Sequence, residues 1–379
     1  MKKAAIYDPY LDTLGGGEKY CLTVAEILLQ HNYQVDLFWS GDPLLLAKAQ
    51  KRFNLNLTSL NQVPDIFNIA KANFRNDFDS RPDLSQKLVS LYQKFSITRQ
   101  YDLFFFLSDG SIPLLFSKQN FLHTQVPFLP APLSIKSSLA KLLKLSLIKK
   151  IICNSKFTQK FVNQAYSHNT TVLYPPVDTT SSSNSSKDNI ILSVGRFDNI
   201  LNAKKQDVLI EVFKKLPAKI IKNWTLVLAG GSLLPPPQNT YLTNLKKISR
   251  GFPVRFMVNP DYASLQDVYR QAKIYWHAAG YGVDESSHPQ NTEHFGITVV
   301  ESMNYGLVPL VIAKGGLPEI VLDNHNGFLW STTDELLSKT LEIISSPTLF
   351  SRLSHQARLS SLRFSKNNFT SNFLSLIQI

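Results

Sequence analysis

Two glutamates, Glu293 and Glu301, stand eight residues apart with a glycine and a mostly apolar run between them. If a helix begins near Phe295 or Gly296, Glu293 lies in the loop before it and Glu301 lies roughly two turns inside it. One acid can then face a reacting group while the other grips a second part of the same ligand. The helix start also offers N–H groups and the positive end of the helix dipole, which suit an anionic group such as a phosphate.

The same stretch, Thr292 to Gly306, also fits a plain amphipathic helix. In that interpretation Ile297, Val300 and Met303 lie in the core and both glutamates are solvated. Residue types alone leave both interpretations open.

Two cations earlier in the second half could neutralise a diphosphate. Arg196 follows the strand predicted to end near Val194, and Lys204 opens the next predicted helix. A guanidinium just past a strand and a lysine at the following helix start can converge on a diphosphate, whose charge must be neutralised as it leaves.

A glycine loop near the N-terminus has a related pattern. A strand is predicted from Lys3 to Asp8, then come Gly15, Gly16 and Gly17, and a helical pattern runs on to Leu29. Glycines let backbone N–H groups approach an anion at a helix start. A simple tight turn remains an equal alternative, because the loop matches neither G-x-G-x-x-G nor a Walker loop.

Short apolar runs alternate with helical segments along the whole chain, which predicts parallel α/β sheets. Proline and serine residues around 179–187 indicate a linker between a first domain, 1–178, and a second, 188–360. Residues 361–379 are expected to form a C-terminal helix that packs back on the first domain. Further strands are predicted at 33–39, 101–107, 120–124, 189–194, 224–229, 254–258, 274–277 and 308–312.

The composition is that of an ordinary globular protein of two or three domains: 379 residues, 44% hydrophobic and 18% charged. We expect a cytoplasmic location, since the apolar stretch after Lys3 is too short for a signal peptide and no segment approaches a membrane span. Cys21 and Cys153 are predicted to be buried thiols, and no Cys/His spacing suggests a zinc site.

The net charge of +12 is unevenly distributed. No acidic residue occurs between Asp109 and Asp178, where lysines recur, so one basic face is expected on the first half. Aromatic residues are not interleaved with these lysines and no nucleic-acid motif is present, so nucleic acid is not the expected partner. In the segment 134–147 leucines and lysines separate onto two sides of a helix. That helix either packs on its own domain or, with residues up to 150, lies on an anionic membrane surface.

Several motifs in order and spacing resemble family 4 glycosyltransferases, which are retaining sugar-nucleotide enzymes. They are the Gly15 to Gly17 loop, Gly195-Arg196, Lys204, Gly230-Gly231-Ser232, the two glutamates, Gly315 to Glu319, and Asn326 to Leu329. The resemblance implies the GT-B fold, in which two Rossmann-like domains face each other across a cleft.

The resemblance also implies roles for single residues. Arg196 and Lys204 would hold the donor diphosphate, although Lys205 stands where a glycine is common, so the lysine assignment could shift by one residue. Glu293 would face the transferred sugar, and Glu301 would bind the ribose hydroxyls. Backbone N–H groups of Phe295, Gly296 and Ile297 would bind sugar and phosphate, and Gly15, Gly16, Gly17 and Gly230 would also lie at the donor. His123 matches the family's first-domain active-site histidine; a core histidine is the alternative.

The activity implied is transfer of a hexose from a nucleotide diphosphate sugar, with retention, to a glycan or lipid-linked acceptor. The sequence from Glu293 to Ile297 is similar to that of mannosyltransferases of the family and favours GDP-mannose as the donor. UDP-glucose and UDP-N-acetylglucosamine are alternative donors, and a non-catalytic sugar-nucleotide-binding protein is an alternative function. No metal is expected, because the formal D-x-D at Asp77 to Asp79 lies in a polar stretch typical of a solvated loop. A cytoplasmic enzyme peripheral to the inner face of the membrane would fit.

Overall fold

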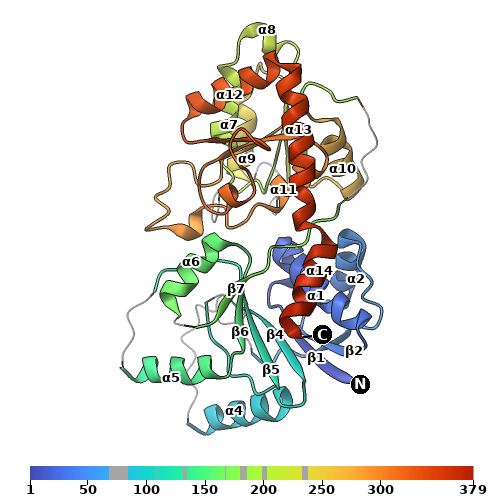
Figure 1. Cartoon of the computed structure of the whole chain (residues 1–379), viewed down its shortest axis with the longest axis vertical. Coiled ribbons are helices and arrows are strands. Elements are labelled where there is room, and N and C mark those ends of the chain that lie inside the picture. The colour runs from blue at the N-terminus through green and yellow to red at the C-terminus, as the bar shows by residue number, and fades with distance from the viewer. Residues whose placement is uncertain are drawn as a thin grey trace. The chain divides into compact units, whose positions relative to one another are not determined.

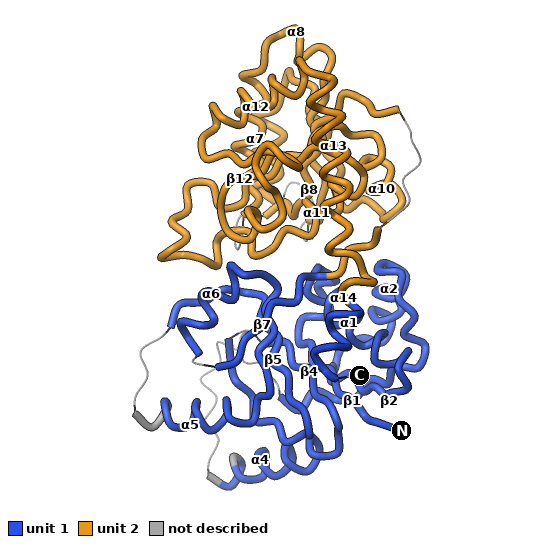
Figure 2. Tube along the Cα trace, viewed as in Figure 1, with its two compact units in different colours: residues 1–175, 370–379 blue, residues 176–369 orange. Residues whose placement is uncertain are grey.

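The computed structural model describes residues 1–67, 84–108, 110–130, 135–166, 168–179, 186–198, 203–232 and 238–378. It divides into two compact units, residues 1–175 with 370–379 and residues 176–369 (Figure 2). The D-x-D at Asp77 to Asp79, residues 180–185 of the serine-rich stretch, and Ser134 at the start of the basic helix lie outside the described residues.

In its described residues the first unit has a seven-stranded parallel sheet in the order β3-β2-β1-β4-β5-β6-β7 (Figure 1). The central strands are almost continuous apolar runs because helices cover the sheet on both sides. The strands are β1 (Lys2–Tyr7), β2 (Tyr33–Phe38), β3 (Asn61–Val63), β4 (Leu103–Ser108), β5 (Gln119–Thr124), β6 (Lys150–Cys153) and β7 (Thr170–Val172). The helices are α1 (Gly16–Gln30), α2 (Pro43–Phe53), α4 (Leu84–Thr98), α5 (Ile135–Ser146) and α6 (Lys156–Ala165).

The second unit has a six-stranded parallel sheet in its described residues, in the order β10-β9-β8-β11-β12-β13. Its strands are β8 (Ile190–Val194), β9 (Thr225–Gly230), β10 (Val254–Val258), β11 (Ile274–His277), β12 (Val308–Ile312) and β13 (Phe328–Trp330). Its helices are α7 (Gln206–Lys214), α8 (Ala218–Ile221), α9 (Thr240–Ile248), α10 (Tyr262–Gln271), α11 (Ile297–Asn304), α12 (Thr333–Ser345) and α13 (Pro347–Ser361). Among the short 3-10 helices, η1 (Leu11–Thr13) belongs to the first unit, and η2 (Pro289–Asn291), η3 (Leu317–Glu319) and η4 (Leu362–Phe364) belong to the second.

Both sheets have the doubly wound order, in which the direction of winding reverses at the middle of the sheet. The reversal lies between β1 and β4 in the first unit and between β8 and β11 in the second. Ligands of open α/β sheets bind outside the carboxyl ends of the strands at such a point. The residues that follow β8 and β11 are therefore the first place to look for a site.

The last helix, α14 (Lys366–Ile377), starts in the second unit and ends in the first. Phe373 of α14 lies edge-on to Phe105 of β4, with ring centroids 6.1 Å apart, and Tyr20 of α1 stacks on the same phenylalanine at 6.2 Å. The two cysteines, Cys21 and Cys153, are free and buried, as the sequence predicts.

Candidate active site

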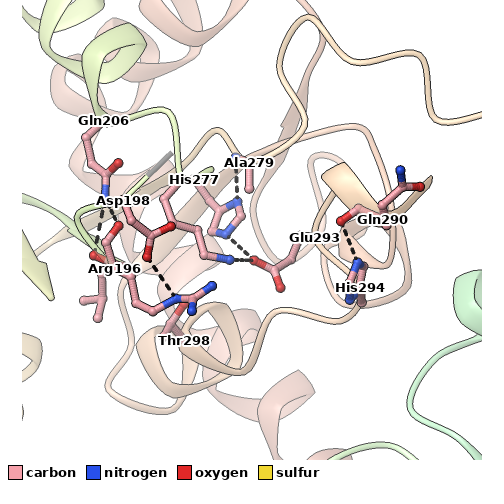
Figure 3. Close-up of polar contacts among 12 residues, drawn as sticks. Arg196, Asp198, Gln206, His277, Ala279, Gln290, Glu293, His294 and Thr298 are labelled. Carbon is pink, nitrogen blue, oxygen red and sulfur yellow. Dashed lines mark hydrogen bonds and ion pairs between the residues drawn. The ribbon is translucent and has the colours of Figure 1, made fainter. Parts of the chain in front are cut away.

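Glu293 lies in the loop between β11 and α11 and accepts two hydrogen bonds on one oxygen. Lys204 Nζ donates to Glu293 Oε2 at 2.7 Å, and His277 Nε2 lies 2.9 Å from the same oxygen (Figure 3). The side chains of Glu293, Lys204 and His277 are 13%, 18% and 3% exposed. The glutamate of the sequence motif is thus mostly withdrawn from solvent and paired, which rules out the interpretation of a solvated surface glutamate.

The strand order brings these three residues together. His277 ends β11, and Lys204 precedes α7, which follows β8, the strand that pairs with β11. Gly195, directly after β8, leaves room for the lysine, because a Cβ there would lie 2.5 Å from Lys204 Cγ. The lysine stem therefore crosses the end of β8 and carries its ammonium group to Glu293.

Lys205 has a backbone that glycine favours, with φ of 53° at the N-cap of α7. This conformation gives a physical reason why glycine would suit the position. Of the two neighbouring lysines, it is Lys204 whose ammonium group pairs with Glu293.

The charges in this cluster favour an ionised glutamate beside a neutral histidine. Burial alone would raise the pKa of Glu293, but the Lys204 charge and the hydrogen bond from His277 lower it well below its usual range. Burial also lowers the pKa of His277, against the opposing effect of Glu293. The Ala279 N–H points at His277 Nδ1 at 3.4 Å, so we assign the ring proton to Nε2, where it is donated to Glu293.

A glycine turn fixes the backbone of Glu293. The Gly316 N–H donates to the Glu293 carbonyl at 2.8 Å, and a Cβ on Gly315 would lie 2.1 Å from that carbonyl oxygen. The Glu285 carboxylate accepts the Gly315 N–H at 2.9 Å. The Gly315-Gly316 pair thus lets two loops approach closely enough to hold Glu293 in place.

The second glutamate is placed by α11. Gly296 caps this helix at φ 114°, and a Cβ there would lie 2.9 Å from Leu317. Glu301 Oε2 accepts a hydrogen bond from the hydroxyl of Tyr269 at 3.1 Å. Val300 and Met303 are buried, as the amphipathic interpretation predicts, and the positive end of the helix dipole lies at Gly296, three residues after Glu293.

The rest of the α11 start is built from buried contacts. Phe295 is 3% exposed and lies edge-on to Phe364, with ring centroids 5.3 Å apart. Ile297 is half-buried as the first residue of the helix. Thr298 accepts a hydrogen bond on Oγ1 from the Tyr275 hydroxyl at 2.8 Å.

Arg196 lies beside this cluster but is more open to solvent. Its side chain is 59% exposed, and Nε is 3.5 Å from Asp198 Oδ2 (Figure 3). Gln206 of α7 donates to the Arg196 carbonyl at 3.0 Å and so ties the loop after β8 to the helix. An exposed guanidinium on a fixed backbone can turn toward an incoming anion at little cost.

Close packing between β8 and β9 requires a glycine at position 230. A Cβ on this residue, the last of β9, would lie 1.9 Å from the carbonyl oxygen of Gly195. Because Gly230 has no side chain, the ends of β8 and β9 can lie close together behind Arg196. The predicted contact of Gly230 with a donor stays a prediction.

In the first unit, His123 lies in β5 and is fully buried. Its Nδ1 is 3.0 Å from the Ile152 carbonyl and its Nε2 is 3.0 Å from the Gln125 amide, so the ring proton is assigned to Nδ1. Tyr20 stacks on the ring at 4.0 Å between centroids, and burial lowers the pKa of His123 to about 3. These contacts describe a neutral histidine with both nitrogens engaged, as in a core histidine, and its catalytic role stays a prediction.

The Gly15 to Gly17 loop does start a helix, but a carboxylate already occupies its first N–H group. The Gly15 N–H donates to Glu18 Oε2 at 2.5 Å, and a Cβ on Gly17 would lie 2.7 Å from Gln125 Oε1. Asp8, fully buried at the end of β1, has its pKa raised well above the usual value by burial and then by the Glu18 charge. An anion at Gly15 would have to displace Glu18, which the pattern of glycines did not reveal.

Three residues of the site were not foreseen. His277 and Tyr269 contact the two motif glutamates, and Glu285 holds the turn behind Glu293. A histidine that ends a buried strand of a parallel sheet was the one available signal, since strand ends of this kind line ligand sites. Within the described ranges, no group of three His, Cys, Asp or Glu side chains could hold a metal ion.

Residues 178–360 match the model of the family described as glycosyl transferases group 1. A protein of Dictyostelium discoideum named GDP-Man:Man(3)GlcNAc(2)-PP-Dol alpha-1,2-mannosyltransferase is 27% identical over 252 residues, covering 62% of this chain and 48% of that protein. Its Xenopus tropicalis namesake is 30% identical over 246 residues, 59% of this chain and 47% of that protein. The chain thus spans about half the length of these relatives. An uncharacterized glycosyltransferase of Haemophilus influenzae is 23% identical over 378 residues, 95% of this chain and 96% of that protein.

Solved structures of the same fold cover the whole chain. Anabaena HepE in complex with UDP and glucose has a TM-score of 0.71 at 19% identity, with 100% of both chains covered. Sucrose-phosphate synthase of Thermosynechococcus elongatus has a TM-score of 0.69 at 15% identity, covering 100% of this chain and 98% of that one. The two parallel α/β units therefore make up a GT-B fold, as the sequence predicts.

Proposed function

The chain belongs to the group 1, or family 4, glycosyltransferases, and we propose that it transfers a mannosyl residue from GDP-mannose, with retention, to a glycan or lipid-linked acceptor. The observation that carries the proposal is the Lys204–Glu293–His277 cluster, which is largely withdrawn from solvent and lies beside the start of α11 and the exposed Arg196. The cations and the helix N-terminus can bind the diphosphate of a sugar nucleotide, and the ionised carboxylate can face its sugar.

Lys204 and Arg196 are assigned to the diphosphate. The Lys204 ammonium has three donors and uses one on Glu293, so it can also bind a phosphate oxygen without leaving the glutamate. Arg196 adds an exposed guanidinium for bidentate phosphate contacts. The N–H groups at Phe295, Gly296 and Ile297 would add the positive end of a helix dipole.

Glu293 is assigned to the sugar and Glu301 to the ribose. When the bond between the anomeric carbon and the diphosphate oxygen breaks, positive charge develops on the sugar ring. The ionised Glu293 stabilises that charge, and His277 keeps the carboxylate charged and oriented. Glu301, held by Tyr269, lies two turns along α11, where it can accept hydrogen bonds from the ribose hydroxyls.

A reaction on one face of the sugar fits this arrangement better than covalent catalysis by Glu293. The Lys204 ion pair stabilises the free carboxylate and so makes it a weaker nucleophile. In the same-face scheme the acceptor hydroxyl bonds to the anomeric carbon as the diphosphate leaves, and its proton passes to the leaving phosphate oxygen. Lys204 and Arg196 then act by stabilising the charge on that diphosphate.

The choice of mannose rests on the relatives, three of which are named GDP-mannose-dependent mannosyltransferases. UDP-glucose or UDP-N-acetylglucosamine is the second candidate, favoured by fold neighbours solved with UDP and glucose or with UDP and GlcNAc. For the acceptor, the relatives' names include a glycan on a dolichol diphosphate, which supports a lipid-linked acceptor. A cytoplasmic protein, peripheral on the inner face of the membrane through residues 134–150, would meet such an acceptor.

Slow donor hydrolysis over a panel of GDP-mannose, UDP-glucose and UDP-N-acetylglucosamine tests the proposal without knowledge of the acceptor. We expect release of GDP to exceed release of UDP, with Glu293→Gln as the inactive reference. Faster release of UDP would contradict GDP-mannose as the donor and favour UDP-glucose or UDP-N-acetylglucosamine. Tight binding of a donor without any release would favour a non-catalytic sugar-nucleotide-binding protein. EDTA should leave the rate unchanged, since the proposed chemistry uses no metal.

A further inference from the structure

Exposed apolar side chains are concentrated on one part of the first unit. Ten of the sixteen large hydrophobic residues that are exposed in the described chain lie between Leu88 and Leu143. On α5, Leu139, Leu142 and Leu143 are 60%, 60% and 61% exposed. The α5 leucines predicted to form the apolar side of this helix therefore face outward, and the alternative in which they pack on their own domain is wrong for these three.

A second helix contributes to the same surface. Leu88, Val89 and Tyr92 of α4 are 57%, 57% and 70% exposed. Lys94 of α4 and Lys144 of α5 are close enough to interact: burial, and then the charge of Lys144, lowers the pKa of Lys94. Figure 1 shows α4 and α5 at the same end of the first unit. We call the exposed residues Leu88, Val89, Leu91, Tyr92, Phe95, Leu139, Leu142 and Leu143 the α4–α5 face.

The charge of this region selects its partner. Neither helix contains an acidic residue, and no Asp or Glu follows in the sequence from residue 110 to residue 177. Lys94, Lys141 and Lys144 belong to the same two helices and are half-buried, and Lys141 Nζ donates to the Ala165 carbonyl. Leucines that alternate with lysines on exposed helices match the two layers of an anionic bilayer, in which hydrocarbon lies beneath phosphate. Within the described ranges no helix could cross that bilayer.

A pocket of about 350 Å³ opens beside α5, within the first unit. Its wall is largely apolar and includes Ile112, Phe128 and Leu129, and the ring of Tyr166 lies 5.3 Å from that of Phe128 between centroids. Lys141 and Lys144 also line it, with Lys141 Nζ 4.6 Å above the centre of the Tyr166 ring. An apolar pocket with two ammonium groups in its lining suits a hydrocarbon chain that ends in an anionic head group.

We propose that the α4–α5 face docks on an anionic phospholipid bilayer and that the pocket beside α5 takes one hydrocarbon chain of a membrane lipid. The inference deepens the proposed use of a lipid-linked acceptor and rests on it for its purpose. It extends the membrane contact from one helix to two and gives the lipid chain a binding site.

Co-sedimentation with vesicles tests the docking surface. The wild-type protein should sediment with vesicles of phosphatidylcholine and phosphatidylglycerol and stay in solution with phosphatidylcholine alone. Leu142→Glu on α5 and Tyr92→Glu on α4 should each weaken binding by about tenfold or more. Lys144→Gln should weaken it by about fivefold. Leu359→Glu is the matched control, because that residue is 49% exposed on α13 of the second unit.

Two outcomes would contradict the proposed docking surface. One is that the wild-type protein does not sediment with the anionic vesicles, and the other is that the Leu142→Glu and Leu359→Glu variants bind these vesicles equally well. Wild-type binding by Tyr92→Glu would remove α4 from the surface. Circular dichroism melts check that the exposed substitutions leave the fold intact.

Binding of cis-parinaric acid, a fluorescent fatty acid, tests the pocket in the absence of vesicles. Ala140 lines the pocket, and Ala140→Trp should fill it and lower the affinity by about tenfold or more. Leu143→Trp places the same ring on the exposed side of the helix and should leave the affinity unchanged. Equal affinities in the two variants, or no binding by the wild type, would overturn the pocket. Neither assay contains donor or acceptor, so a failure here is distinguishable from a failure of the proposed transfer.

Discussion

Removing the hydrogen bond from His277 to Glu293 should slow transfer and shift its pH dependence. In His277→Phe a ring remains, but the Nε2–H donor 2.9 Å from Glu293 Oε2 is lost. A hydrogen bond to a charged group contributes about 1.5–3 kcal/mol. If that bond serves the charged carboxylate in the transition state, kcat should fall by roughly 10- to 100-fold.

The pH profile separates this role from a merely structural one. Burial raises the pKa of Glu293, while Lys204 and His277 hold it well below the ordinary value of 4.5. A carboxyl with a depressed pKa is ionised above that pKa, so wild-type activity should be lost only as the pH falls well below 4.5. Without the donor at residue 277 the pKa of Glu293 rises, and the acid limb should move to higher pH.

Hydrolysis of GDP-mannose, followed as GDP release across the acid range, measures both effects. His277→Gln keeps an amide donor and should recover part of the rate and of the low-pH activity. His355→Phe, an exposed histidine on α13, is the control for loss of an imidazole. The reasoning is refuted if His277→Phe loses rate while its acid limb stays at the wild-type pH, because the histidine would then serve only the fold.

Three further substitutions test the neighbouring parts of the site. Arg196→Ala should lower kcat by roughly 100-fold or more with an unchanged melting temperature, since the side chain is 59% exposed; unchanged transfer kinetics would remove Arg196 from the diphosphate. Lys205→Gly removes the strain of a positive φ of 53° and should raise the free energy of unfolding by about 0.5–1 kcal/mol in urea titrations. A loss of turnover in this variant would mean that Lys205, not Lys204, binds the donor. Gly315→Ala places a Cβ 2.1 Å from the Glu293 carbonyl oxygen, so we expect a loss of roughly 2 kcal/mol or more in stability together with lower activity, and a variant like the wild type in both would show that the turn does not fix Glu293.

The strands that carry the site were predictable because each is a buried apolar run. The predicted ranges 254–258, 274–277 and 308–312 coincide with β10, β11 and β12. Three-residue strands at the sheet edges, β3, β7 and β13, were not foreseen, because so few residues give no periodic pattern. Their place depends on pairing with a neighbouring strand rather than on their own sequence.

The site residues were predictable as types, but their contacts were not. Glu293 and Lys204 are 89 residues apart in sequence, and their ion pair depends on β8 lying beside β11. Strand order of this kind cannot be read from local patterns. The same limit hid His277, which acquires its contact only when β11 ends at the loop of Glu293.

The glycine loop of the first unit shows how a local pattern can mislead. Three glycines before a helix suggested an open row of N–H donors, yet Glu18 folds back onto the Gly15 N–H. A glutamate three residues after the helix cap is itself a sequence signal for such a contact. Reading that signal would have reduced the weight given to a phosphate at this loop.

The most direct test of the account is the rate of GDP release from GDP-mannose by the wild type and by Glu293→Gln, measured under saturating donor. The account predicts slow hydrolysis by the wild type and a rate at least about 100-fold lower in the variant, with donor affinity changed only slightly, because Lys204 and Arg196 still hold the diphosphate. A variant that releases GDP as fast as the wild type would contradict the role given to Glu293.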